Sequence, residues 1–144
     1  MMSKKKKALL LIMVLLCLPL CACASQDQAE TEPAEAWHTI SAEEAMQMMT
    51  EAEGDYTILD VRTEEEYMKG HVKGAFLVPH DEVAQVAGTD LCGFDKMIFV
   101  YCQTGKRSAI AAETLAGEGC TNVYDFGGIE DWPYETVTGM EAEG

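Results

Sequence analysis

The chain has 144 residues, with 25 acidic residues against 10 basic ones and a formal net charge of −15 at pH 7. Binding to a nucleic-acid backbone depends on cationic patches, so this charge argues against nucleic acid as a partner. Strong negative charge is better explained by solubility in an exposed compartment.

The first 22 residues have the composition of a signal peptide. Lys4–Lys7 precede an apolar run that ends at Leu20, and a basic segment followed by a short apolar one is typical of secretory signals. A membrane-spanning helix needs about 20 apolar residues, so this shorter run is expected to be cleaved. Cys23 follows the small Ala22, which resembles the lipobox of bacterial lipoproteins. We therefore expect a lipidated Cys23 that attaches the protein to the bacterial cell membrane outside the cytoplasm; an ordinary secretory signal and an uncleaved anchor are the alternatives.

The remaining chain divides into three parts. Residues 23–36 contain no large apolar side chain, so they cannot offset the entropy of ordering and are predicted to be a flexible acidic tether. The folded domain is expected over residues 37–137, about 100 residues, which is enough for one small core. Residues 138–144 are predicted to be an acidic tail.

The domain begins with alternating strand and helix signals. Trp37–Ile40 is predicted to be a short strand, and Ser41 with Glu44 has the capping-box pattern of a helix start. One face of this helix carries Ala45, Met48 and Met49, a pattern typical of core packing. Tyr56–Val61 is predicted to be a buried strand.

A second capping box follows. Thr63 and Glu66 predict a short helix that ends at Gly70. Ala75–Val78 is predicted to be the third strand, and a weak helix signal covers Asp81–Ala87.

The last part of the domain contains two further strands. Met97–Tyr101 is apolar enough to be the most buried strand, and Thr121–Phe126 is predicted to be the fifth. Between them, Ser108–Ala116 is expected to be helical with Ala109, Ala112, Leu115 and Ala116 on one face, and Gly127–Trp132 opens a last short helix. Five strands with intervening helices predict a single α/β domain with a five-stranded parallel sheet and helices on both faces.

Cys102 directly follows the fourth strand, at the edge where parallel α/β sheets bind ligands. The loop after it leads into a helix N-terminus, and the backbone N–H groups of such a turn form an anion-binding nest. These amides, together with Lys106 and Arg107, are expected to favour a thiolate that is open to solvent, and Gly105 gives the loop conformational freedom. An inert buried cysteine beside a solvated Lys-Arg pair is the alternative. A nucleotide P-loop is excluded because Val100 stands where the first glycine is required.

Three stretches resemble, in the correct order, the signatures of the rhodanese family. Cys102–Ser108 resembles the active-site loop C-R-x-G-x-R-[ST], Ile58–Pro79 resembles D-x-R…E-[YF]-x-x-G-H-[IV]-x-G-A, and Phe126–Trp132 resembles the closing G-G…W segment. The resemblance implies a single rhodanese-like domain. In such enzymes the loop cysteine takes a sulfane sulfur from a donor such as thiosulfate, holds it as a persulfide and passes it to a thiophilic acceptor.

Carried over by position, the resemblance makes Cys102 the catalytic nucleophile. The substrate-binding cradle that it implies consists of Gln103, Thr104, Gly105, Lys106 and Arg107. The spacing C-x4-R favours sulfur transfer over the phosphoryl transfer of the related cysteine phosphatases, which have C-x5-R. Gln103 stands where the family most often has arginine, and this favours a donor less charged than thiosulfate, such as a persulfide or polysulfide.

Asp60 and Arg62, at the end of the second strand, are expected to support the loop. Asp60 is predicted to reach Arg107 or a loop amide, and Arg62 to pair with Glu66. His71 is expected to be a hydrogen-bonded core histidine. The chain's three histidines lack ligand spacing, so neither a metal nor another cofactor is expected.

Cys92 and Cys120 are expected to form a disulfide if the compartment is oxidising, which leaves Cys102 free; the sequence leaves this pairing open. The sequence therefore predicts a membrane-tethered, extracytoplasmic sulfurtransferase that acts on a small anionic or sulfane-sulfur substrate, with room for a protein acceptor. The alternative is a non-catalytic rhodanese-like module that binds partners or senses redox state at the cell surface.

Overall fold

The computed structural model describes residues 37–88, 90–93 and 96–140. The signal peptide, the lipidated Cys23 and the tether, all predicted within residues 1–36, lie outside the described residues, as do the last four residues of the predicted tail. In the part of the chain that the structure describes, no helix has the length and apolar character needed to cross a bilayer.

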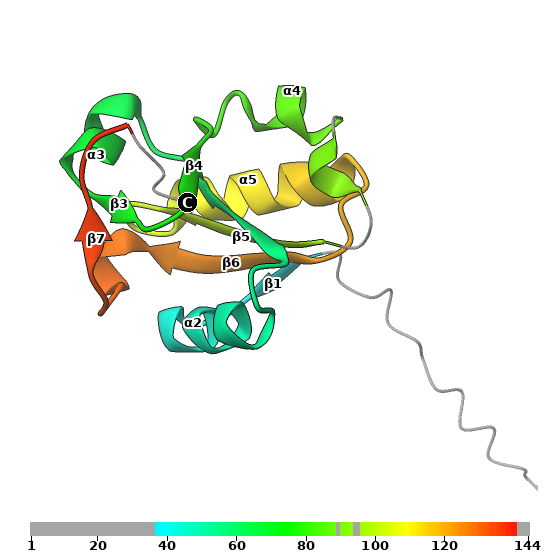
Figure 1. The fold of residues 1–144 in the computed structure, drawn as a ribbon. Helices are drawn as coiled ribbons and strands as arrows, with labels where there is room; N and C mark the ends of the chain where they lie inside the picture. Colours follow the sequence, from blue (N-terminus) through cyan, green and yellow to red (C-terminus); the bar gives the residue numbers. More distant parts are fainter. Residues whose placement is uncertain (1–36, 89, 94–95, 141–144) are drawn as a thin grey trace, which may run out of the picture. The chain divides into compact units, whose positions relative to one another are not determined.

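Five parallel strands form the main sheet, in the order β1-β6-β5-β2-β4 (Figure 1). The strands are β1 (Trp37–Thr39), β2 (Tyr56–Asp60), β4 (Ala75–Leu77), β5 (Met97–Cys102) and β6 (Val123–Gly128). This confirms the predicted five-stranded parallel sheet. β5 is its central strand, and every residue of β5 after Met97 is buried.

Helices cover both faces of this sheet, as predicted (Figure 1). They are α2 (Ala42–Glu51) on one face, α4 (Val83–Ala87) and α5 (Lys106–Gly117) on the other, and α3 (Glu64–Lys69) beyond the carboxyl ends of the strands. Successive strand residues point to opposite faces. Phe99 and Tyr101 consequently pack in the core with α2, whereas Ile98, Val100 and Cys102 pack in the core with α5.

Capping side chains determine where α2 and α3 begin. Ser41 Oγ accepts a hydrogen bond from the Glu44 amide (3.1 Å) at the start of α2. At the start of α3, Thr63 and Glu66 form the complete predicted capping box. Each bond satisfies a backbone N–H that has no partner within the helix.

α5 differs from its prediction at its first turn. It begins at Lys106, two residues earlier than expected, because Gly105 in the left-handed conformation (φ 93°) turns the chain directly into the helix. The buried face consists of Ser108, Ala111, Ala112 and Leu115. Ala109 and Ala116, predicted on that face, are half-buried.

A small second sheet was not predicted. β3 (His71–Val72) pairs antiparallel with β7 (Thr136–Val137), next to the carboxyl ends of the main strands (Figure 1). Two 3-10 turns, Asp90–Cys92 and Ile129–Asp131, also lie between the longer elements. Two-residue strands show no periodicity in a sequence, so no pattern could reveal this pairing.

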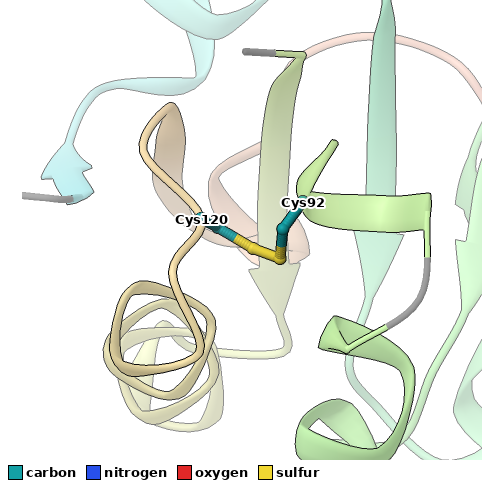
Figure 2. Close-up of a disulfide and its surroundings, with 2 residues drawn as sticks. All are labelled: Cys92 and Cys120. Carbon is teal, nitrogen blue, oxygen red and sulfur yellow. A yellow bond between two sulfur atoms is a disulfide. The ribbon is translucent and has the colours of Figure 1, made fainter. Parts of the chain in front are cut away.

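Cys92 and Cys120 are joined by a disulfide across 28 residues of chain (Figure 2). Their Cα atoms are 4.6 Å apart, within the range that a disulfide requires. Cys92 precedes β5 and Cys120 precedes β6, so the bond lies at the amino ends of the strands. Cys102 is at the opposite end of β5 and is a free thiol.

Candidate active site

Cys102 ends β5 and lies at the edge of the sheet that the sequence predicted. Cys102 is only 1% exposed, because its side chain packs in the core with α5. The expectation of a thiol open to solvent is therefore wrong.

The loop amides point toward the sulfur and not toward solvent. The Gly105 N–H donates to Cys102 Sγ at 3.1 Å. Burial raises the pKa of the Cys102 thiol, but hydrogen bonds from the backbone and hydroxyl of Ser108 and from the amides of Thr104 and Gly105 outweigh it, so the pKa is lowered. The sulfur is therefore buried and yet disposed to ionise.

The loop is shaped by contact with two glycines at the end of β6. A Cβ on Gly128 would lie 2.3 Å from the Gln103 carbonyl oxygen and 2.8 Å from Thr104 Cα. Gly127 has a positive φ of 85° and lies against Gly105. The closing Gly-Gly segment thus makes room for the loop of Cys102.

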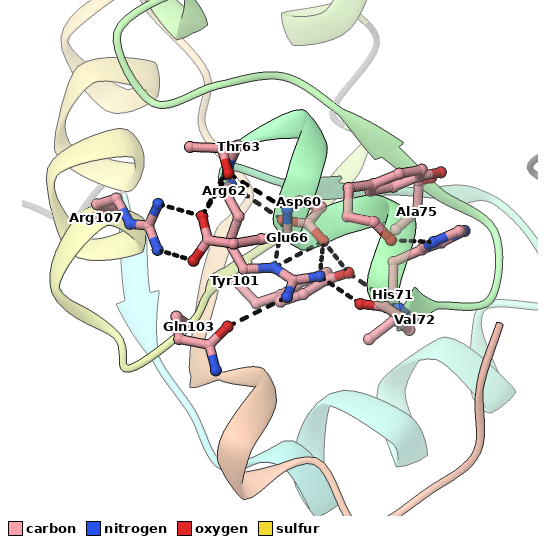
Figure 3. Close-up of polar contacts among 12 residues, drawn as sticks. Asp60, Arg62, Thr63, Glu66, His71, Val72, Ala75, Tyr101, Gln103 and Arg107 are labelled. Atoms are coloured by element: carbon pink, nitrogen blue, oxygen red, sulfur yellow. Dashed lines mark hydrogen bonds and ion pairs between the residues drawn. The ribbon is translucent and has the colours of Figure 1, made fainter. Parts of the chain in front are cut away.

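Arg107 is held by Glu66 of α3. Its Nη1 and Nη2 atoms donate to the two carboxylate oxygens at 2.8 and 2.7 Å (Figure 3). The same carboxylate accepts hydrogen bonds from the amide (3.0 Å) and hydroxyl (2.9 Å) of Thr63. The Arg107 hydrogen bond lowers the pKa of Glu66 to about 2, so the ion pair is fully charged at neutral pH.

Arg62 turns back onto Asp60 at the end of β2. Its Nη2 atom donates to Asp60 Oδ2 at 2.6 Å, and both side chains are buried (Figure 3). The predicted pairs, Asp60 with Arg107 or a loop amide and Arg62 with Glu66, are therefore wrong. The reason is local: the Arg62 amide also donates to Asp60 (3.0 Å), while the capping box turns Glu66 toward α5.

Gln103 links the loop to these supports. Its side-chain oxygen accepts from Arg62 Nη1 at 3.2 Å, and its amide nitrogen donates to Glu130 at 2.9 Å. Arg62 therefore contacts the loop through Gln103, as a supporting residue. Thr104 and Lys106 have exposed side chains.

Tyr101 completes a buried network under the loop that sequence reasoning did not identify. Its hydroxyl donates to Asp60 Oδ2 (2.6 Å) and accepts from the Val72 amide (3.0 Å). Burial and the Asp60 carboxylate raise the pKa of Tyr101, so the hydroxyl remains a donor. Arg62 Nη2 also donates to the Gly70 carbonyl oxygen at 2.6 Å. The network joins β2, β5 and β3 beside the loop.

His71 has the structural role that the sequence indicated. It is fully buried, its Nδ1 lies 3.1 Å from the Tyr67 carbonyl oxygen, and its ring stacks on that of Tyr67 at 3.6 Å. Within the described ranges, no group of three or more His, Cys, Asp or Glu side chains is arranged to hold a metal ion.

A pocket of about 360 Å³ lies beside the loop. Its lining residues are Arg62, Glu66, Lys69, Gly70, Gln103, Ile129 and Thr136. Arg62 and Gly70 lie just before and just after α3, which contributes Glu66 and Lys69. Gln103 belongs to the loop, Ile129 to the 3-10 turn that follows β6, and Thr136 to β7, so the small second sheet forms part of the pocket wall. The pocket is large enough for a small molecule near Gln103.

The chain is similar to known proteins over most of the domain. A family model described as a rhodanese-like domain matches residues 41–134. Thiosulfate sulfurtransferase GlpE of Pseudomonas entomophila (strain L48) is 35% identical over 107 residues, which cover 73% of this chain and 92% of that protein. Thiosulfate sulfurtransferase PspE of Escherichia coli (strain K12) is 36% identical over 81 residues, 56% of this chain and 78% of that protein.

One further sequence relative and one solved structure are also similar to this chain. The match to the uncharacterized protein YqhL of Bacillus subtilis (strain 168) is 37% identical but spans only 59% of that protein's length. Among solved structures, a rhodanese with anions from E. coli has a TM-score of 0.55 and 34% identity, over 58% of this chain and 99% of that one. The parallel sheet described above is thus similar to that of a rhodanese.

Proposed function

Because the chain belongs to the rhodanese-like family, we propose that it is a sulfurtransferase that works through a persulfide on Cys102. The observation that carries this proposal is the free sulfur of Cys102 at the end of β5, with the Gly105 N–H 3.1 Å away and its pKa lowered. A thiolate is the form of cysteine that attacks sulfur.

The reaction consists of two displacements at sulfur. In the first, the Cys102 thiolate attacks the outer sulfur of a donor such as thiosulfate, the donor's S–S bond breaks, and sulfite leaves with the electron pair. Cys102 then carries a persulfide anion. In the second, a thiophilic acceptor such as cyanide takes the terminal sulfur and leaves as thiocyanate, which restores the thiolate. No external oxidant or reductant is consumed.

The loop residues have separate roles in this proposal. The amides of Thr104 and Gly105 hydrogen-bond the sulfur of Cys102, and the same N–H groups stabilise the negative charge of the persulfide. Arg107 is paired with Glu66, and the pKa of its guanidinium is raised chiefly by the hydrogen bond to Glu66 and also by the charge of Cys102; in this proposal it helps to balance the negative charge of the sulfur. Asp60 and Arg62 position the loop, and no cofactor takes part.

The proposed location is the outer side of the cell membrane, through a lipid on Cys23. The proposal also includes the thiol of another protein as one class of sulfur acceptor. The oxidised Cys92–Cys120 pair is compatible with an extracytoplasmic compartment.

A binding or redox-sensing module is the second candidate function. The observation in its favour is the burial of Cys102, which is only 1% exposed. A donor must enter the loop to reach this sulfur, whereas a docking module needs no such access.

Intact-mass measurement after incubation with sulfane donors tests the proposal. We expect a gain of about 32 Da, one sulfur, that maps to Cys102, together with transfer of sulfur to cyanide. In the Cys102→Ser variant both should fall to the rate without enzyme, while Cys92 and Cys120 stay joined. If no donor adds sulfur to Cys102, the binding module is the better account.

A further inference from the structure

A second pocket, of about 160 Å³, shares no lining residue with the pocket near Gln103. Its walls come from α2, β2, β3 and the segment between the 3-10 turn after β6 and β7, and we call it the α2 pocket. α2 and α5 cover opposite faces of the main sheet (Figure 1). Because Cys102 packs in the core with α5, the α2 pocket is separate from the candidate active site.

The interior of the α2 pocket is apolar. Met49, Ile58, Val72 and Trp132 line it, and each of them is at most 8% exposed. Met46 adds a second thioether to the wall, and methionine sulfur makes favourable contacts with aromatic rings. An apolar cavity of about 150 Å³ is large enough to bind benzene. The size and the walls of this pocket therefore suit a single aromatic ring with a small substituent.

One buried polar group in the wall of the α2 pocket has no partner. The indole Nε1 of Trp132 is buried and makes no hydrogen bond within the described part of the chain. The indole ring packs against Phe126 and Tyr134, with centroid distances of 5.2 and 5.0 Å, which helps to fix its orientation. An indole N–H can only donate, and a buried donor without a partner is destabilising. The group that satisfies it must be a hydrogen-bond acceptor.

The charged side chains of the α2 pocket are of opposite sign. Lys73 and Glu135 both line it and are both exposed, so they lie at its opening. Val72 of β3 pairs with Thr136 of β7, and the two charged residues flank this pair on neighbouring strands. Opposite charges at one opening favour neither a cation nor an anion. A neutral ligand also enters an apolar pocket without the cost of burying a charge.

From these features we propose that the α2 pocket is a binding site for a small neutral aromatic carbonyl compound. The ring packs among the methionines and Trp132, and the carbonyl oxygen accepts a hydrogen bond from Trp132 Nε1. A carbonyl oxygen is an acceptor that brings no donor of its own, so the ligand buries no further unpaired N–H or O–H group. The proposal goes beyond sulfur transfer, since no residue of the Cys102 loop takes part.

A water molecule is a poorer partner for this indole. Buried waters typically make about three hydrogen bonds. The four most buried side chains of the wall, Met49, Ile58, Val72 and Trp132, offer only one strong hydrogen-bonding group, the indole N–H. A carbonyl compound needs only this one bond, and its ring gains the apolar contacts that a water molecule lacks.

The test is a titration of the ¹⁵N-labelled protein with acetophenone, followed through the indole N–H signals. The chain has two tryptophans; Trp132 lines the α2 pocket, and Trp37 does not, so Trp37 serves as an internal reference. α-Methylstyrene is the control probe, because it has the same shape and carries a CH₂ group in place of the oxygen. We expect acetophenone to move the Trp132 indole proton downfield in a saturable way, and α-methylstyrene to cause no such downfield shift.

Two threonine variants show where the probe binds. Thr50 and Thr114 each donate a hydroxyl to the carbonyl oxygen four residues earlier, at 2.8 Å. Thr50 lines the α2 pocket, whereas Thr114 lies on α5. Thr50→Phe should occupy the opening and weaken acetophenone binding at least about tenfold. Thr114→Phe should change it by no more than about twofold, as is usual for a substitution away from a site.

Three results would overturn the inference: a Trp132 signal that does not shift in a saturable way up to the solubility limit of acetophenone, equal shifts from the two probes, or equal effects of the two threonine variants. The sulfurtransferase proposal fails or stands separately. Cys102→Ser removes the sulfur acceptor of that reaction and should leave acetophenone binding as it is in the wild type.

Discussion

At Cys102, two opposing effects act on one sulfur. Burial disfavours the thiolate, and hydrogen bonds from Thr104, Gly105 and Ser108 favour it, with the second effect the larger. Sequence reasoning identified the attracting amides but not the burial. The distinction matters because a buried thiolate is protected from large oxidants and depends entirely on the shape of its loop.

The contact between Gly128 and the loop yields a prediction at this scale. Gly128 has ordinary extended geometry (φ −108°, ψ 148°), so alanine is allowed by its backbone. Its Cβ would still lie 2.3 Å from the Gln103 carbonyl oxygen, and the loop would have to move. We expect Gly128→Ala to lower stability by about 1–3 kcal/mol and to slow sulfur addition at Cys102 at least about tenfold.

Gly117→Ala is the control for this change. Nothing lies within 4 Å of a Cβ at Gly117, in the last turn of α5, so the variant should keep its sulfur-transfer rate and gain up to about 1 kcal/mol. Thermal unfolding and the rate of sulfur addition, measured on both variants, make the comparison. A fully active Gly128→Ala protein would show that the loop does not need this contact.

Individual side-chain partners were the least predictable feature from the sequence. Asp60, Arg62, Glu66 and Arg107 were all singled out, yet the structure pairs Arg62 with Asp60 and Arg107 with Glu66. Spacing along the chain suggested Arg62 with Glu66, one helical turn apart. The capping box was the available signal against that pair, because a Glu that caps its own helix N-terminus points away from the strand before it.

At the scale of elements, an ion pair connects α3 to the segment formed by β5, the loop and α5. Glu66 serves two elements at once: it completes the capping box of α3 and binds Arg107 in the first turn of α5. The start of α3 therefore helps to position the loop of Cys102. Both capping patterns were readable from the sequence, because caps depend on residues only three positions apart.

This link predicts different consequences for two similar helix caps. Thr63→Ala and Ser41→Ala should each lower stability by about 0.5–2 kcal/mol, since each removes a cap hydrogen bond. Thr63→Ala should also slow sulfur addition about twofold to tenfold, the equivalent of one hydrogen bond, because Glu66 loses its 2.9 Å bond from the Thr63 hydroxyl. Ser41→Ala, at the start of α2, should leave the rate as it is.

Denaturant unfolding gives the stability change, and the mass-based rate gives the effect on the site. Equal rates for Thr63→Ala and Ser41→Ala would show that α3 contributes only to folding. A loss of rate in both variants would instead indicate a general effect of stability.

For the whole molecule, the sequence was sufficient for the main sheet. Its elements could be predicted from four sequence patterns: apolar runs for the buried strands, capping boxes for helix starts, glycines for helix ends, and the loop motif after β5. Long-range pairing was not visible in the same way. The antiparallel pair of β3 and β7 joins residues 71–72 to residues 136–137, and the Cys92–Cys120 bond depends on a 4.6 Å Cα separation that only the fold provides.

The fold also places the disulfide and the candidate nucleophile at opposite ends of β5. The disulfide lies at the amino ends of β5 and β6, and the free thiol lies at the carboxyl end of β5. Three cysteines in a small domain can therefore coexist without exchange between the disulfide and Cys102. The two ion pairs at the carboxyl end, Arg62 with Asp60 and Arg107 with Glu66, are likewise a property of the assembled molecule, because the second pair joins α5 to α3.

The central claim is that the folded protein lowers the pKa of the Cys102 thiol and so favours its thiolate form. The most direct test is the rate of alkylation of Cys102 by iodoacetamide as a function of pH, followed by mass measurement with Cys102→Ser as the background. Because hydrogen bonds lower the pKa of this thiol, the rate should rise with pH to a plateau whose midpoint lies below the ordinary cysteine value of about 8.5. A midpoint at or above that value, or alkylation only after unfolding, would contradict the account.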